Sequence, residues 1–426
     1  MIVKSYLPGS ISIGCKYLLA VTLVIAACFN AVSQERLKPE GHIPILAWIG
    51  VPENETTIER FSELKESGIN INFSVYSNVE AVEKALDIAQ KTGVKLLFSC
   101  PELRSEPEKT VRQLMKHPAL FGYHLKDEPV ASEFPELGAW IKRIQAIDTK
   151  HPCYINLFPD YAAPEQLFGK DLQIQPGKDA YTEYVETFLK EVPVPFISFD
   201  HYPVVEKNGI KTLRPEWYKN LETIATASRQ SGLPFWAFAL SVAHGPYPVP
   251  STAEIRLQLY SNLAYGAQAL QYFTYWTPGI NPYWDFHDAP VGLDGKRTDV
   301  YDRIQIVNRE IQNLAAVFLN ARLISVFHTG SHIPAGASRM DKLPDPVKVL
   351  ETSDGGAIVS VLEKGKRRFL VIVNRDFQNP MKMTIVTDET VKRVLKDGIL
   401  VNANRYTPTL EVDPGDIVIY TWEEKQ

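Results

Sequence analysis

The chain has 426 residues, so its length predicts a large domain with a smaller companion, or two domains of intermediate size. Apolar residues make up 45% and charged residues 22% of the chain. These values are ordinary for a globular protein, and they exclude wholesale disorder and a polytopic membrane protein. The formal net charge of -5 offers no basic excess to neutralise phosphates, which argues against nucleic acid as the main partner.

Residues 1–33 have the order of regions found in a secretory signal peptide. Two lysines precede the apolar run 17–28, which is too short to span a bilayer comfortably. Two cleavage sites remain open. Ala31-Val32-Ser33 suits an ordinary signal peptidase, whereas the four residues that end at Cys28 resemble a bacterial lipobox that would leave Cys28 acylated. The sequence therefore predicts export to the bacterial periplasm or cell surface, with Cys28 as a candidate lipid anchor.

From residue 34 onward, short apolar runs typical of strands alternate with amphipathic runs typical of helices. Strands are predicted at 43–50, 71–76, 94–99, 121–125, 153–157, 196–200, 235–240 and 269–276. Helices are predicted at 57–67, 79–92, 135–147, 216–230, 252–265 and 299–318. This alternation over about 280 residues predicts a closed parallel (β/α)8 TIM barrel, an α/β fold, at 34–322. No glycine-rich phosphate loop follows the first strand, which argues against a dinucleotide-binding sheet.

The pattern changes after about residue 322, where short strands are separated by Gly, Asp and Asn turns. These strands are predicted at 349–352, 357–362, 368–373, 381–386, 391–395 and 417–422. They predict an antiparallel all-β sandwich domain at 323–426. Because the connection to the barrel is short, we expect the sandwich to be fixed in place and mainly structural.

Two cysteines, Cys100 and Cys153, follow the predicted signal peptide. An oxidising compartment would permit a disulfide between them. However, Cys100 falls at the C-terminal end of the third predicted strand and Cys153 at the N-terminal start of the fifth, farther apart than a disulfide can reach. We therefore expect both thiols to be free.

In a barrel of this type the chemistry takes place at the C-terminal ends of the strands, so polar and aromatic residues there are candidate site residues. In chain order they are Trp48, Tyr76, Glu102, His124, Asp127, Glu128, Asn156, Asp200, His201, Tyr202, Ser241, His244, Tyr275 and Trp276. Cleavage of a glycosidic bond needs a protonated carboxyl for the leaving oxygen and a second carboxylate for the anomeric centre. Aromatic rings such as Trp276, with Trp48 and Trp284, can stack on sugars, although packing explains many tryptophans as well.

The segment 122–129 ends in Lys126-Asp-Glu-Pro129. It resembles the Asn-Glu-Pro ending of the fourth strand in the large clan of retaining (β/α)8 glycoside hydrolases that includes the family 42-like β-galactosidases and the family 5-like enzymes. The resemblance implies that Glu128 is the general acid. The segment 200–203, Asp-His-Tyr-Pro, also resembles this clan, in which a His or Tyr at the sixth strand orients the catalytic groups. An acidic Glu-Pro pair could instead begin a helix, but its predicted place at a strand end favours the catalytic interpretation.

The chain departs from the clan in two ways. The Asn that hydrogen-bonds the sugar 2-hydroxyl in the clan is Asp127 here, and the clan nucleophile, a Glu at the end of the seventh strand, has no counterpart in 238–245. Asp200 is the leading candidate for the second carboxylate, because strand six lies two strands from strand four and could leave room for an attacking water, as inverting chemistry requires. Asp200 could equally be a structural partner of His201. Weaker candidates are Glu102, Asp285 and Asp288.

Three functions therefore remain open. The first is a glycoside hydrolase that acts on an oligosaccharide or polysaccharide, for which we expect no cofactor. The second is a barrel that lost its nucleophile and binds a glycan without cutting it. The third is a metal-dependent hydrolase with His124, His201 and His244 at one rim, although the His-x-His pair and bridging Lys common at such sites are missing.

Overall fold

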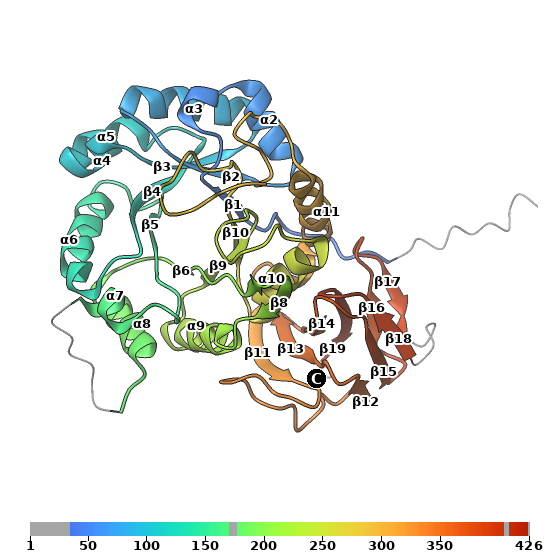
Figure 1. Cartoon of the computed structure of the whole chain (residues 1–426). Helices are drawn as coiled ribbons and strands as arrows, with labels where there is room; N and C mark the ends of the chain where they lie inside the picture. The colour runs from blue at the N-terminus through green and yellow to red at the C-terminus, as the bar shows by residue number, and fades with distance from the viewer. Residues whose placement is uncertain (1–34, 170–176, 404–408, 425–426) are drawn as a thin grey trace, which may run out of the picture.

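The structure is a computed structural model that describes residues 35–169, 177–403 and 409–424. The predicted signal peptide and Cys28 lie outside the described residues. Within them, a barrel surrounded by helices is followed by antiparallel sheets packed against one side of it (Figure 1). No helix in these ranges is both long and apolar enough to cross a bilayer.

The eight predicted barrel strands are confirmed in the described part of the chain. They are β1 (Ile45–Trp48), β2 (Ile71–Val75), β3 (Lys95–Ser99), β4 (Leu120–Asp127), β5 (Cys153–Asn156), β6 (Ile197–Phe199), β9 (Phe235–Leu240) and β10 (Ala269–Phe273). Neighbours in the order β5-β4-β3-β2-β1-β10-β9-β6 pair in parallel. A parallel bridge between Leu157 and Phe199 links the two ends of this sheet, with the Leu157 N–H donating to the Ser198 carbonyl at 2.9 Å. The predicted (β/α)8 class is therefore confirmed.

The helices cover the outside of the barrel. The predicted helices correspond to α2 (Ile58–Glu66), α3 (Val79–Thr92), α6 (Phe134–Gln145), α9 (Trp217–Ser231), α10 (Thr252–Ala264), and α11 (Asp299–Asn313) with α12 (Ala315–Phe318). Shorter or more polar elements went unpredicted: η1 (Glu53–Glu55), α4 (Pro101–Ser105), α5 (Pro107–Leu114), η2 (Ala131–Glu133), α7 (Pro164–Phe168) and α8 (Ala180–Glu191). Capping residues determine where several of these helices begin and end. In α3, for example, the Asn78 side chain accepts from the Ala81 N–H and Gly93 follows in the left-handed conformation.

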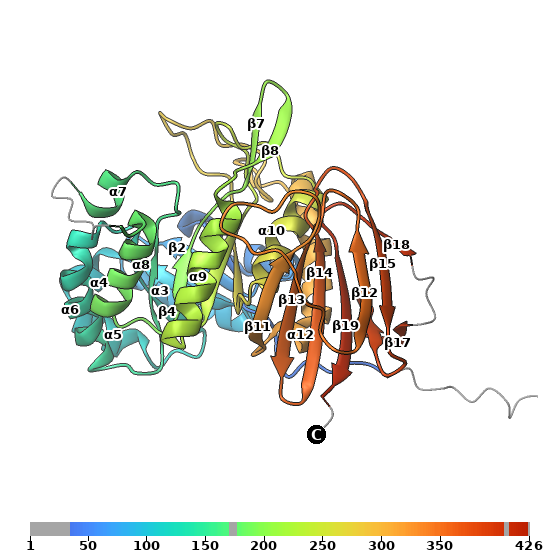
Figure 2. The same cartoon turned by 90° about the horizontal axis from the view of Figure 1, so that it is seen from below.

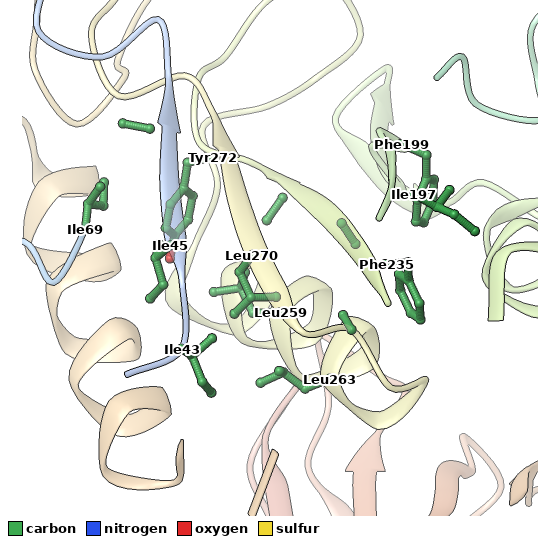
Figure 3. Close-up of a cluster of buried hydrophobic side chains, with 14 of the residues drawn as sticks. Ile43, Ile45, Ile69, Ile197, Phe199, Phe235, Leu259, Leu263, Leu270 and Tyr272 are labelled. Carbon is green, nitrogen blue, oxygen red and sulfur yellow. The ribbon is translucent and has the colours of Figure 1, made fainter. Parts of the chain in front are cut away.

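Alternation along the strands builds two apolar layers. On β1, Leu46 and Trp48 face the barrel interior, whereas Ile45 and Ala47 face outward. Figure 3 shows the outward layer, in which Ile45 and residues of β10 lie near side chains of α10. The inner layer fills the barrel below its mouth, so the functional cavity is confined to the C-terminal ends of the strands.

The C-terminal part forms two packed antiparallel sheets, as predicted. Among the described residues, the larger sheet contains β11 (Arg322–His328), β13 (Ala357–Lys364), β14 (Arg367–Asn374), β19 (Ile417–Glu423), β16 (Lys392–Val394) and β17 (Leu400–Asn402). The smaller sheet contains β12 (Val347–Thr352), β15 (Met381–Thr387) and β18 (Thr409–Val412). The strands β11, β17 and β18 were not predicted.

The larger sheet is buried on both faces. On β14, Leu370 and Ile372 face the smaller sheet, whereas Phe369, Val371 and Val373 join the apolar layer of the barrel. Helix α10 contacts β13 and β14 and is buried almost all round (Figure 2). The sandwich is therefore packed onto the barrel through a continuous apolar core.

Two further features are a hairpin near the mouth of the barrel and the place where the described chain begins. A hairpin of β7 (Val204–Lys207) and β8 (Ile210–Leu213), which went unpredicted, projects beyond the barrel next to the loop that follows β10 (Figure 2). The described chain begins on the sandwich, where Arg36 bridges Ile399 and the Glu35 carbonyl accepts from the Leu400 N–H at 2.7 Å.

Both predicted free thiols are confirmed. Cys100 and Cys153 are buried and unbonded to each other, because they lie at opposite ends of strands that are not neighbours in the barrel.

Candidate active site

A cavity of about 480 Å³ opens at the C-terminal ends of the barrel strands. Seven predicted site residues line it: Trp48, Asp127, Glu128, Asn156, Asp200, Tyr202 and His244. Residues that the sequence did not single out complete the lining: Phe158, Pro159, Tyr161, Ala162, Gln166, Arg214, Phe238, Pro246, Tyr247, Phe273 and Phe286; Trp284, predicted as a sugar platform, lines it too. Most of these additional residues come from loops, which carry no periodic pattern that would place them.

Three predicted sugar-binding residues do not line the cavity. Tyr76, Tyr275 and Trp276 are buried in the outward apolar layer, between the strands and the helices. Tyr76 directly follows β2, where one step of the alternation decides between the two sides of the barrel wall. Tyr275 and Trp276 lie beyond the end of β10, where the alternation no longer applies. The expectation that these three residues contact substrate is therefore not met in this structure.

Two predicted histidines are also turned away from the cavity. His124 lies in the barrel interior, 4.4 Å from the Phe73 ring and 5.2 Å from the Trp48 ring between centroids, and neither of its nitrogens has a partner among the described residues. Burial lowers the pKa of His124 to about 3, which keeps it neutral. His201 points toward α9, with Nδ1 3.0 Å from the Asn220 Oδ1 and 3.3 Å from the Asp160 Oδ1. These contacts correct the prediction that His201 binds substrate.

The weaker candidates for a second carboxylate, Glu102, Asp285 and Asp288, do not line the cavity either. Ser241, at the end of β9, donates its hydroxyl hydrogen bond to the Thr274 carbonyl at 2.6 Å and is buried. Among the described residues, no cluster of three or more His, Cys, Asp or Glu side chains has an arrangement that could hold a metal ion.

A bulge in β4 aims the acidic residues at the cavity. Pairing with β5 shifts by one residue at Leu125, so that Asp127 comes to lie opposite Asn156. Glu128 then has a φ of 45°, and its N–H donates to the Asn156 carbonyl at 2.9 Å. A positive φ is uncommon for a residue other than glycine, and such outliers cluster at functional sites. The backbone of Glu128 is thus held in a rare conformation that directs its carboxyl into the cavity.

Asn156 joins two of the carboxylates. Its Nδ2 donates to the Asp127 Oδ1 at 3.2 Å and to the Asp200 Oδ1 at 3.0 Å. The opposite end of the amide is fixed, because its Oδ1 accepts from the Ser198 hydroxyl at 2.9 Å and Ser198 in turn accepts from the Gln271 Nε2 at 2.9 Å. This buried chain determines that the amide presents its donors, rather than its oxygen, to the acidic residues.

The carboxyl groups of Glu128 and Asp200 lie side by side in the cavity. They are hydrogen-bonded to each other, and burial, followed by the negative charges of Asp200 and Asp127, raises the pKa of Glu128 well above its usual range. Burial and the charge of Asp127 raise the pKa of Asp200 as well, but hydrogen bonds from Asn156 and Tyr202 stabilise its ionised form. A proton shared by the pair is therefore held more tightly by Glu128 than by Asp200.

This contact differs from the gap that the sequence interpretation expected. Two carboxyl groups in a direct hydrogen bond leave no room between them for an attacking water, as an inverting pair would require. Asp127 belongs to the same group of acids, and the cavity walls raise its pKa by desolvation although its side chain remains open to solvent in the cavity.

Aromatic side chains form one wall of the cavity. The ring of His244 lies 4.7 Å from Phe286, 4.8 Å from Tyr247 and 5.5 Å from Trp284 between centroids. Burial lowers the pKa of His244, so the imidazole is neutral at neutral pH. Flat apolar rings beside a cluster of carboxyl groups suit a ligand with C–H faces and many hydroxyl groups.

No protein-family profile and no curated protein matches the sequence at a significant level. The fold does match solved structures. A β-galactosidase from Bacillus circulans sp. alkalophilus has a TM-score of 0.60 at 9% identity, over 89% of this chain and 99% of that one. A catalytic mutant of a GH42 β-galactosidase from G. stearothermophilus has a TM-score of 0.56 at 10% identity, over 92% of this chain and 100% of that one. The chain therefore shares the barrel and C-terminal sheets of family 42-like structures, which confirms the predicted resemblance at the level of the fold.

Proposed function

We propose that the protein is a glycoside hydrolase that cleaves an O-glycosidic bond in an oligosaccharide or polysaccharide, with Glu128 as its general acid. The observation that carries the proposal is a pair of carboxyl groups, Glu128 and Asp200, in an aromatic-walled cavity at the mouth of the barrel, where burial and the neighbouring charges raise the pKa of Glu128. The two solved structures described above are β-galactosidases, which supports a sugar as the ligand. A shared fold alone does not carry function, so the proposal rests on the site.

Glu128 supplies the proton that the leaving oxygen needs. Its raised pKa keeps it protonated at neutral pH, where an ordinary glutamate would be ionised. Once the leaving group has departed, the ionised Glu128 accepts a proton from the water that attacks the anomeric centre, which restores the protonated acid. The negative charge of Asp200 stabilises the positive charge that develops on the sugar ring in the transition state.

The test compares the wild type with Glu128→Gln on a panel of aryl glycosides and oligosaccharides. We expect the variant to lose roughly 10²- to 10⁴-fold in kcat on substrates with poor leaving groups, because Gln cannot donate the proton. Dinitrophenyl glycosides should lose far less, since their leaving group departs without protonation. Asp200→Asn should impair both substrate types. Equal turnover of both types by the wild type and Glu128→Gln would remove Glu128 from this role.

A second candidate function is a barrel that binds a glycan without cutting it. The observation that favours it is made at the end of β9, where the segment 238–245 contains no Asp or Glu that could serve as a nucleophile. In that case the wild type would turn over none of the panel, yet calorimetry would detect glycan binding that the Trp48→Ala substitution weakens.

We also propose that the protein is exported and attached to a membrane through Cys28, on the basis of the apolar run and lipobox-like residues before it. Metabolic labelling with a radioactive fatty acid should mark the full chain. Cys28→Ser should abolish the label and release the protein into the soluble fraction. Label retained by this variant would contradict the proposal.

A further inference from the structure

Arg214 lines the same cavity as the carboxyl groups. Among the described residues it is the only lysine or arginine that does so. Its N–H donates to the Pro203 carbonyl at 2.7 Å, which fixes the base of the hairpin close to Tyr202. The guanidinium carbon lies 4.4 Å from the centre of the Tyr161 ring and 5.6 Å from that of Tyr247, and Nη2 donates to the Tyr247 hydroxyl at 3.0 Å. The cation is therefore held in one place by two aromatic rings.

Most of the hydrogen-bonding capacity of this guanidinium is unused. A guanidinium has five N–H donors, and with the described residues Arg214 makes one side-chain hydrogen bond. Its Nε is buried and has no partner there, and no carboxylate oxygen of the described residues lies within 4.0 Å. By contrast, the partly buried Arg256 donates twice to Glu310, at 3.1 and 2.5 Å. Arg214 is half-buried, with its Nε out of contact with solvent. A charge withdrawn from water is normally paired, so the vacant donors of Arg214 indicate a negatively charged ligand.

We infer that the sugar bound in the cavity carries an anionic group, the carboxylate of a uronic acid or a sulfate ester, and that Arg214 binds it. The identity of the ligand as a sugar rests on the proposed function. A rigid, planar guanidinium matches such groups with two parallel N–H bonds. The negative charge of Asp200 repels a second anion, so the guanidinium also determines which way round the sugar lies.

The experiment uses matched pairs of aryl glycosides that differ only at C6, with a hydroxymethyl, a carboxylate or a 6-O-sulfate. The gluco, galacto and manno series in both anomers cover the unknown configuration. Turnover is measured for the wild type, Arg214→Met, Arg214→Lys and the control Arg229→Met, which removes an exposed charge of α9 outside the cavity. In parallel, calorimetry with Glu128→Gln, alone and combined with Arg214→Met, measures binding of the free acidic and neutral sugars.

We expect an acidic substrate to be preferred over its neutral partner. In Arg214→Met the ratio of their kcat/KM values should fall roughly 10- to 100-fold, since a hydrogen bond to a charged group is lost. Arg214→Lys should retain part of the preference, and Arg229→Met should keep all of it. The arm with the larger effect, carboxylate or sulfate, identifies the anion. Thermal unfolding of each variant separates these effects from misfolding.

Two outcomes separate the inference from the proposed function. If no glycoside is turned over but acidic sugars bind in a manner that depends on Arg214, the hydrolase proposal fails and the anion site stands. If neutral sugars are bound and cleaved at least as well as acidic ones, or the ratio is unchanged in Arg214→Met, the inference is overturned while the hydrolase stands.

Discussion

At the residue scale, the buried carboxyl of Glu128 makes the stability of the protein depend on pH. Its pKa is raised in the folded state, so between its ordinary pKa and the raised value the folded state binds more protons than the unfolded one, and stability falls as pH rises. Glu128→Gln has no charge to bury. We expect its free energy of unfolding, relative to wild type, to rise by at least about 1 kcal/mol between pH 5 and pH 8.

Urea unfolding followed by circular dichroism at the two pH values measures this difference. The control is Lys109→Gln, which changes a residue at an exposed site. Its free energy of unfolding, relative to wild type, should be the same at both pH values. A constant difference between Glu128→Gln and wild type at both pH values would show that the Glu128 carboxyl titrates normally in the folded protein.

The same scale shows what the sequence could predict of the site. Glu128 and Asp200 were placed correctly at the rim, because each follows a recognisable apolar strand. Whether a residue at a strand end points into the barrel depends on a register that a single bulge, such as that at Leu125, changes by one. Arg214 and Tyr247 come from irregular segments, so no pattern in the sequence brings them to the cavity.

At the scale of elements, the long periodic strands and helices were predictable and the short polar ones were not. The hairpin of β7 and β8 has mixed exposure and little apolar alternation, although Asn208-Gly209 is a typical two-residue turn. Both residues have positive φ, 54° and 76°, as a type I′ turn requires. The dipeptide was therefore the one local indication of an element that carries Arg214 to the cavity.

Helix α10 permits a test of how its N-terminus is stabilised. The Ser251 hydroxyl accepts from the Glu254 N–H at 3.2 Å, and the Glu254 carboxylate accepts from the Ser251 N–H at 2.7 Å. Such a capping box satisfies two otherwise free donors, so Ser251→Ala should lower the free energy of unfolding by about 1 kcal/mol. Ser105→Ala, at an exposed position, should change it by less than about 0.5 kcal/mol. Similar losses in the two variants, measured by urea unfolding, would speak against the cap.

At the scale of the whole molecule, the packing of the sandwich on the barrel includes one close approach of two backbones. Gly415, in a turn of the sandwich, lies so close to α10 that an added Cβ would come within 2.2 Å of the Ala253 carbonyl oxygen. Gly365 has a similar φ, 60° against 67°, but open space around it. We expect Gly365→Ala to cost about 1 kcal/mol for backbone strain and Gly415→Ala about 1–3 kcal/mol more for the clash. Calorimetry measures the loss of unfolding free energy in both variants. Equal losses would contradict the close approach at Gly415.

The position of the first described residues determines how the molecule would be oriented on a membrane. Glu35 and Arg36 are bonded to the sandwich at the start of β17. Figure 2 shows β17 and the β7–β8 hairpin on opposite sides of the molecule. If Cys28 carries the proposed lipid, seven residues separate that lipid from Glu35, and a chain of this length reaches at most about 25 Å. Such a short tether would hold the sandwich against the bilayer and turn the mouth of the barrel outward, where it meets polymers in the surrounding medium rather than lipid head groups.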